Sequence, residues 1–126
     1  MERRVIHSPG AAPVISYAPA IDIAGATRLP FLSGQAPVAP DGTVPEGIIA
    51  QTRQVWANLF ALLAAADMTA DNLAKVTVFL SDGALRMAVG TVSDKIMGDR
   101  LVAWTTIIAG IVHDGWLLEI EAVAVA

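Results

Sequence analysis

The closing stretch, residues 117–125, constrains the fold most, because Leu-Leu-Glu-Ile-Glu-Ala-Val-Ala-Val predicts a β-strand with two apolar faces. Side chains alternate along a strand, so one face carries only small or apolar residues: Leu118, Ile120, Ala122 and Ala124. On the other face Glu119 and Glu121 stand between a leucine and two valines, which makes this face too apolar to lie simply in water. We therefore expect the first face to pack on the chain's own helices and the second on another subunit, with Glu119 at an interface cavity.

The composition agrees with an oligomer of single-domain chains. Of 126 residues, 55% are hydrophobic and only 16% are charged, which leaves little charge to cover a free-standing surface. The absence of cysteine excludes disulfides and thiolate chemistry, and the net charge of −4 argues against nucleic-acid partners. No apolar stretch reaches the roughly 18 residues of a membrane span. We expect one cytoplasmic domain over residues 1–126, with residues 1–16 as an extended lead-in and no membrane partner.

Two short β-rich runs near the start predict a hairpin. Residues 20–23 and 31–35 flank a turn-like segment at residues 25–28. Pro30 lacks the backbone donor that an interior strand needs, so we expect the second strand at a sheet edge or at a bulge. Residues 37–42 predict a loop.

Two amphipathic patterns predict helices. The first follows a capping-box pattern at Thr43 and Glu46, and its stripe recurs every three or four residues: Ile48, Thr52, Val55, Leu59, Leu62, Leu63 and Ala66. The second follows a cap at residues 81–83 and ends at Gly98, with this stripe: Leu85, Ala88, Val89, Val92 and Ile96.

The remaining patterns complete the fold class. Residues 75–80 and 102–112 predict two strands, and Asp114-Gly115 is typical of a hairpin turn into the closing strand. The order β-β-α-β-α-β-β places both helices on one face of a mixed sheet, which is an α+β sandwich.

Few side chains in the sequence carry an obvious chemistry. There is no P-loop, no dinucleotide fingerprint and no metalloprotease motif, and the sequence predicts neither a metal site nor a cofactor. His7 and His113 fall in the lead-in and in a turn, where surface histidines are common. Glu119 and Glu121 are paired carboxylates of the kind used in acid–base catalysis, although salt bridges at a subunit rim would use them equally well.

Four segments resemble the Rid family, also called YjgF or endoribonuclease L-PSP. They are Tyr17 ahead of residues 20–22, Ser33-Gly34-Gln35, residues 75–80 and residues 118–125. The resemblance covers nearly the whole chain from Tyr17 onward, in order and with fitting lengths. It implies a homotrimer with a chorismate-mutase-like fold, in which clefts between subunits bind small molecules.

The resemblance also implies roles for single residues. In the best-known members, the cleft hydrolyses small imine or enamine acids to 2-keto acids and ammonia. Glu119 matches a glutamate that positions the attacking water, and Tyr17 matches a cleft tyrosine. The substrate-binding positions fall at Ser33, at Thr106, at Gly90 in place of an asparagine, and at Trp104 in place of an arginine.

The tryptophan at position 104 leaves the function open. The arginine of the family holds the substrate carboxylate through a bidentate contact, whereas an indole offers one neutral donor. We therefore expect a deaminase or related hydrolase with altered specificity. The alternative is a trimeric small-molecule binding protein without turnover, in which Trp104 fills the cleft or stacks on the ligand. A nucleic-acid role is least consistent with the acidic charge.

Overall fold

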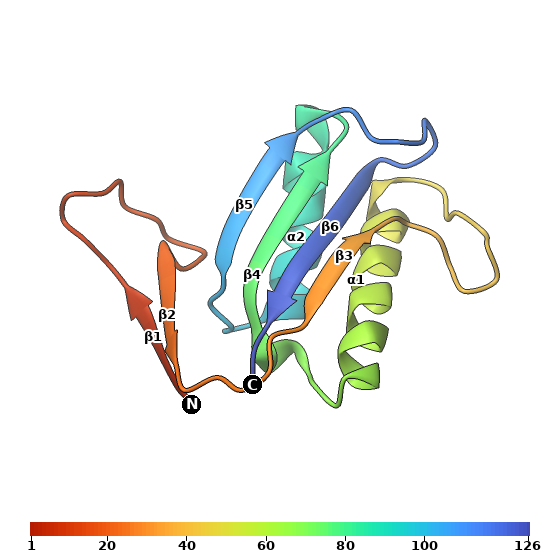
Figure 1. Ribbon diagram of the computed structural model, residues 1–126. Helices are drawn as coiled ribbons and strands as arrows, with labels where there is room; N and C mark the ends of the chain where they lie inside the picture. The colour runs from red at the N-terminus through yellow and green to blue at the C-terminus, as the bar shows by residue number, and fades with distance from the viewer.

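A four-stranded mixed sheet forms the body of the protein in a computed structural model that describes residues 1–126 (Figure 1). Its strands, in spatial order, are β3 (Phe31–Gln35), β6 (Leu118–Ala124), β4 (Leu73–Leu80) and β5 (Ala103–Ile108). The central strand β6 is antiparallel to both neighbours, whereas β4 and β5 run parallel. Both helices, α1 (Ile48–Ala65) and α2 (Arg86–Met97), lie on the same side of this sheet. The predicted α+β class with two helices on a mixed sheet is confirmed.

The closing strand has the two faces that its alternation predicts. Its helix-facing residues are at most 3% exposed and belong to the main hydrophobic core: Leu118, Ile120, Ala122 and Ala124. On the opposite face, Glu119 and Val123 are half-buried and Glu121 is exposed. No helix covers that face (Figure 1), so we call it the open face of the sheet. The packing of the first face on the chain's own helices is confirmed.

The helix α1 carries the predicted apolar stripe but begins later than the capping pattern indicates. Val55 and Leu59 are fully buried, whereas Leu62 is 43% exposed. The N-cap is Gly47, without a side-chain cap. The predicted capping box is wrong, because the Thr43 hydroxyl and backbone N–H both donate to the Asp41 carboxylate, at 2.7 and 3.0 Å, and form a local turn instead.

The helix α2 follows a short 3₁₀ turn, η2 (Gly83–Leu85), which is capped by Asp82 within the predicted cap segment. The Asp82 carboxylate accepts the Ala84 N–H at 2.9 Å, and Gly98 ends the helix with a φ of 58°. Val89 and Val92 face the interior. A second short 3₁₀ turn, η1 (Ala70–Asn72), precedes β4 and is capped by Thr69.

The start of the chain differs from its prediction in two respects. Residues 2–6 are not a plain lead-in, because β1 (Glu2–Ile6) pairs antiparallel with β2 (Ala20–Ala24) in a separate two-stranded sheet. The predicted hairpin between residues 20–23 and 31–35 is wrong, because β3 pairs with β6 instead of β2. Both strands exist where the pattern places them, and β3 is an edge strand with a register shift, as Pro30 indicates.

The segment after β5 also pairs differently from its prediction. A turn does form at residues 113–116, where the Trp116 N–H donates to the His113 carbonyl at 3.0 Å. The predicted hairpin is nevertheless wrong, because β5 pairs in parallel with β4 while β6 inserts between β3 and β4. This central place gives β6 hydrogen-bonding partners on both edges, which a hairpin at the rim of the sheet would not provide.

Candidate functional site

A groove of about 760 Å³ runs between β5, α2 and the segment that precedes β2. Four of the six predicted site residues line it: Tyr17, Gly90, Trp104 and Thr106. They come from three separate parts of the chain, so the fold itself brings them together. We call this hollow the β5 groove.

Trp104 forms an aromatic wall of the β5 groove. It lies opposite the buried Val76 of β4 in the sheet register, and its ring packs 6.0 Å from that of Trp56 on α1. Its indole N–H donates to the Thr106 hydroxyl at 3.0 Å. Because an indole has only this one donor, Trp104 can offer a ligand a flat apolar surface but no further hydrogen bond.

Tyr17 is held at the rim of the groove by its neighbour in the chain. The Ala18 N–H donates to the Val102 carbonyl at 2.9 Å, and Ala18 forms a parallel bridge with Ala103 at the free edge of β5. Ala18 is 1% exposed, whereas Tyr17 is 36% exposed. The backbone is therefore fixed while the phenol remains accessible.

Gly90 leaves the helix side of the groove open. A Cβ atom added at this position would meet nothing within 4 Å. The space that a larger side chain would occupy is therefore part of the groove.

The remaining two predicted residues, Ser33 and Glu119, lie outside the β5 groove: Glu119 is on the open face, and Ser33 is on the edge strand β3. Ser33 sits within the register shift of β3 between Leu32 and Gln35. The Glu119 carboxylate lies over the neighbouring Gly34, where an added Cβ would stand 3.3 Å from its Oε2. The chain contains two ion pairs, Arg4–Asp22 and Arg100–Asp71, so Glu119 has no cationic partner.

The sheet separates the two groups of residues within one chain. Trp104 and Thr106 point to the helix side, and Glu119 points to the open face. Ser33 on β3 and Trp104 on β5 also belong to opposite edges, which three strand spacings hold roughly 14 Å apart. A site that uses all six residues therefore needs two chains.

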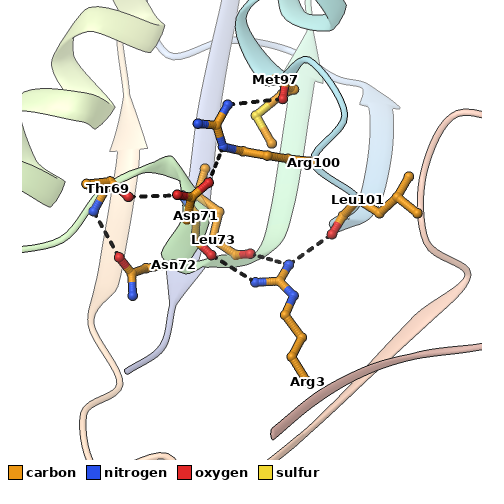
Figure 2. Close-up of polar contacts among 8 residues, drawn as sticks. All are labelled: Arg3, Thr69, Asp71, Asn72, Leu73, Met97, Arg100 and Leu101. Atoms are coloured by element: carbon orange, nitrogen blue, oxygen red, sulfur yellow. Dashed lines mark hydrogen bonds and ion pairs between the residues drawn. The ribbon is translucent and has the colours of Figure 1, made fainter. Parts of the chain in front are cut away.

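Two arginines that the sequence does not assign to the site also line the groove. Arg100 is bound through Nε to Asp71 at 2.6 Å and through Nη1 to the Met97 carbonyl at 3.2 Å (Figure 2). Arg86, the first residue of α2, also lines the groove, and its guanidinium has no hydrogen-bond or ion-pair partner within the chain. Its position one helical turn before Gly90 is the signal that could have found it.

The other sequence candidates do not join this site. His113 stacks on Trp116 with ring centroids 5.1 Å apart, in the turn before β6. No group of three or more histidine, aspartate or glutamate side chains could hold a metal ion. None of the helices has the length and apolar character to cross a membrane.

The fold and the groove define a class of protein: an α+β chain with two helices on one mixed sheet and a small-molecule-sized hollow at a sheet edge. The family model described as endoribonuclease L-PSP matches residues 7–126. The chain therefore belongs to this family, which is also the Rid or YjgF family.

Individual relatives agree over nearly the full length. Protein DfrA of Myxococcus xanthus is 32% identical over 129 residues, which cover 100% of this chain and 98% of DfrA. The crystal structure of YyfB, a Rid-family protein of unknown function from Yersinia pestis, superposes with a TM-score of 0.85 at 25% identity and 100% coverage of both chains. The structure of TdcF from E. coli with bound serine gives a TM-score of 0.74 at 26% identity, covering 98% of both chains. Family membership supports a small-molecule deaminase or small-molecule binding role.

Proposed function

We propose that the protein is a cytoplasmic homotrimer that hydrolyses a small imine, enamine or related carbonyl-derived metabolite in clefts between subunits. The observation that carries this proposal is the division of the predicted site. Four residues line the β5 groove, whereas Glu119 lies on the open face of the same sheet and Ser33 on the opposite edge strand β3. Apposition of the open face of one chain with the groove of the next would unite them.

The chemistry of such a cleft follows from the groups it would contain. Glu119 would hold a water molecule so that its oxygen adds to the carbon of the C=N bond. Proton transfer to the nitrogen and loss of ammonia then leave the carbonyl product. Tyr17 and Ser33 would place the substrate through their hydroxyl groups, and Thr106 would line the pocket. The serine bound in TdcF supports a small polar ligand of this size.

Trp104 argues for a specificity different from that of 2-iminobutanoate and 2-iminopropanoate deaminases. Its single donor is already bound to Thr106, so it cannot replace an arginine that holds a carboxylate. A guanidinium hydrogen-bonded to a carboxylate stabilises it by roughly 1.5–3 kcal/mol per bond. Arg86 is a cation of the groove without a partner, and it would serve a substrate whose negative charge lies elsewhere.

The same tryptophan favours the alternative of a trimeric binding protein without turnover. Trp104 packs on Trp56 and closes part of the groove with an aromatic surface. A flat ligand could stack there without meeting any reactive group. The hydrolase and the binding protein would use the same trimer and the same cleft, so only a measurement of turnover distinguishes them.

The deciding experiment measures keto-acid release from freshly generated 2-iminobutanoate and 2-iminopropanoate. We expect the natural protein to be slow and Trp104→Arg to be at least about tenfold faster, because two charged hydrogen bonds to the substrate carboxylate are gained. Trp116→Arg is the matched control, since Trp116 is also half-buried but lies outside the groove. If Trp104→Arg and the natural protein are equally inert, the cleft does not become a deaminase when the carboxylate clamp is restored, and the binding protein is favoured.

A further inference from the structure

Several strand edges in this chain lack partners, among them the outer edges of β2 and β3. The hairpin of β1 and β2 forms its own sheet, so the outer edge of β2 is unpaired, and β3 pairs only with β6. Such edges expose rows of N–H and C=O groups that readily take up another strand. A two-stranded hairpin is also marginally stable at best by itself. The outer edges of β2 and β3 are therefore both free to pair with another strand.

The hairpin stands apart from its expected place beside β3. Figure 1 shows it next to β5, at the edge of the main sheet opposite to β3. The bridge between Ala18 and Ala103 holds it there. While this bridge exists, β2 cannot reach the β3 edge of its own chain.

Arg3 provides a second tether between the hairpin and the body of the protein (Figure 2). Its guanidinium donates to the carbonyl groups of Leu73 at 2.6 Å, Leu101 at 2.9 Å and Asp71 at 3.2 Å. Burial lowers the pKa of Arg3, and the Asp71 carboxylate opposes this shift. We call these three contacts the Arg3 clasp. It joins β1 to η1, to the first residue of β4 and to the segment that precedes β5.

The segment between β2 and β3 is also fixed in an open form. Gly25 takes a φ of 76°, and the N–H groups of Thr27 and Arg28 both donate to the Ala126 carbonyl, at 2.7 and 2.8 Å. The Ala126 N–H in turn donates a hydrogen bond to the Arg28 carbonyl at 3.0 Å. Residues 25–28, which the sequence assigns to a tight turn, thus lead the chain away from the hairpin.

We propose that the outer edge of β2 pairs with the outer edge of β3 in the next copy of this chain, so that the N-terminal hairpin is exchanged around the trimer. The inference rests on the trimer of the proposed function. An opened connection between two strands that would otherwise pair is the usual origin of such an exchange. It would complete a six-stranded sheet from two chains.

The exchange would connect the two halves of the proposed cleft. The hairpin loop carries Tyr17 to the groove of its own chain, whereas β2 would join the strand that carries Ser33 of the next chain. Each cleft would then be tied together by backbone hydrogen bonds as well as by side-chain packing.

Disulfide trapping tests the exchange, because the chain contains no cysteine. Phe31→Cys on β3 is combined in turn with cysteine at Ile21, Asp22, Ile23 or Ala24 on β2; four consecutive positions sample both faces of the strand. After oxidation, non-reducing electrophoresis separates chains linked to each other from chains linked internally. The matched control places the second cysteine at Met87 on α2, which is 80% exposed and away from β3.

We expect covalent species of two and three chains, up to three times 13.1 kDa, for at least one β2 position and not for the Met87 control. Light scattering on the uncrosslinked proteins measures the assembly independently. A trimer whose chains are linked only internally, or not at all, overturns the exchange and leaves the proposed function standing. A monomer overturns both.

Discussion

The strongest prediction about stability concerns the buried hydrogen bond that joins the two helices. The Trp56 indole N–H donates to the Ser93 hydroxyl at 3.0 Å, and the two residues are 0% and 1% exposed. Ser93→Ala removes the acceptor and leaves the indole N–H buried without a partner. An unsatisfied buried donor costs about 1–3 kcal/mol. Alanine regains up to about 0.5 kcal/mol through its higher helix propensity. We therefore expect a net loss of roughly 1–2 kcal/mol.

This loss is large against a total stability of about 5–15 kcal/mol for a domain. Urea denaturation of Ser93→Ala should show a lower midpoint with an unchanged m-value, and Tm should fall by about 4–8 °C. All variants must be compared at one protomer concentration, because subunit association contributes to the apparent stability.

Thr91→Ala is the matched control. Thr91 belongs to the same helix, but its hydroxyl bonds to the Met87 carbonyl at 2.9 Å on the exposed side, where water can replace it. Its effect should stay within about 0.5 kcal/mol. If Ser93→Ala proves as stable as Thr91→Ala, the buried bond between the helices makes no contribution and the reasoning is wrong.

Three further predictions follow from local geometry. Gly90→Ala should raise the free energy of unfolding by up to about 1 kcal/mol in a denaturant titration, because alanine favours the helix and its Cβ meets nothing within 4 Å; a loss of stability would show that the space is filled in the assembly. The Asp41 carboxyl should titrate by NMR at a lower pKa than in the unfolded chain, chiefly because of the Thr43 N–H and then its hydroxyl. Its contribution to stability is therefore present above the unfolded pKa of about 3.9 and is lost as the pH falls through the lower folded value; Thr43→Val should partly reverse the shift, and an unchanged titration would contradict this cause. Arg3→Ala should accelerate amide hydrogen exchange in β1 and β2 while β4 stays protected, since the Arg3 clasp is lost; equal exchange in natural and variant protein would mean that the clasp does not hold the hairpin.

The sequence was most informative where a pattern depends on one element alone. The alternation in residues 117–125 predicts which side chains of β6 are buried, because it needs only a strand with two different environments. The stripes of α1 and α2 likewise follow from the helical period.

Strand partners could not be predicted in the same way. The segments that form β2 and β3 were located correctly, but the choice of partner depends on contacts from distant residues, such as Ala18 with Ala103. Asp114-Gly115 is typical of a hairpin turn, yet β6 gains more by pairing with two strands in the sheet centre. The residues of a turn do not indicate whether β6 pairs with the preceding strand or with β3 and β4.

The candidate site shows the same limit. Trp104 and Thr106 are two residues apart on one strand, so their common face follows from the sequence. The division of the six residues between the β5 groove and strands β3 and β6 depends on the strand order, which the sequence alone did not provide. Arg86 was missed because its relation to the groove arises only when α2 packs beside β5.

Complementation between chains tests the central claim most directly, namely that one cleft takes Trp104 and Glu119 from different chains. The natural chain supplies Glu119 but no arginine at position 104. The double variant Trp104→Arg, Glu119→Gln supplies that arginine but no glutamate at position 119. Each should be slow alone in keto-acid release from 2-iminobutanoate. The account predicts that co-expressed chains form mixed trimers whose turnover clearly exceeds that of either parent. If Trp104→Arg alone is active but the mixed trimers are not, the cleft does not combine the two chains and the account is wrong.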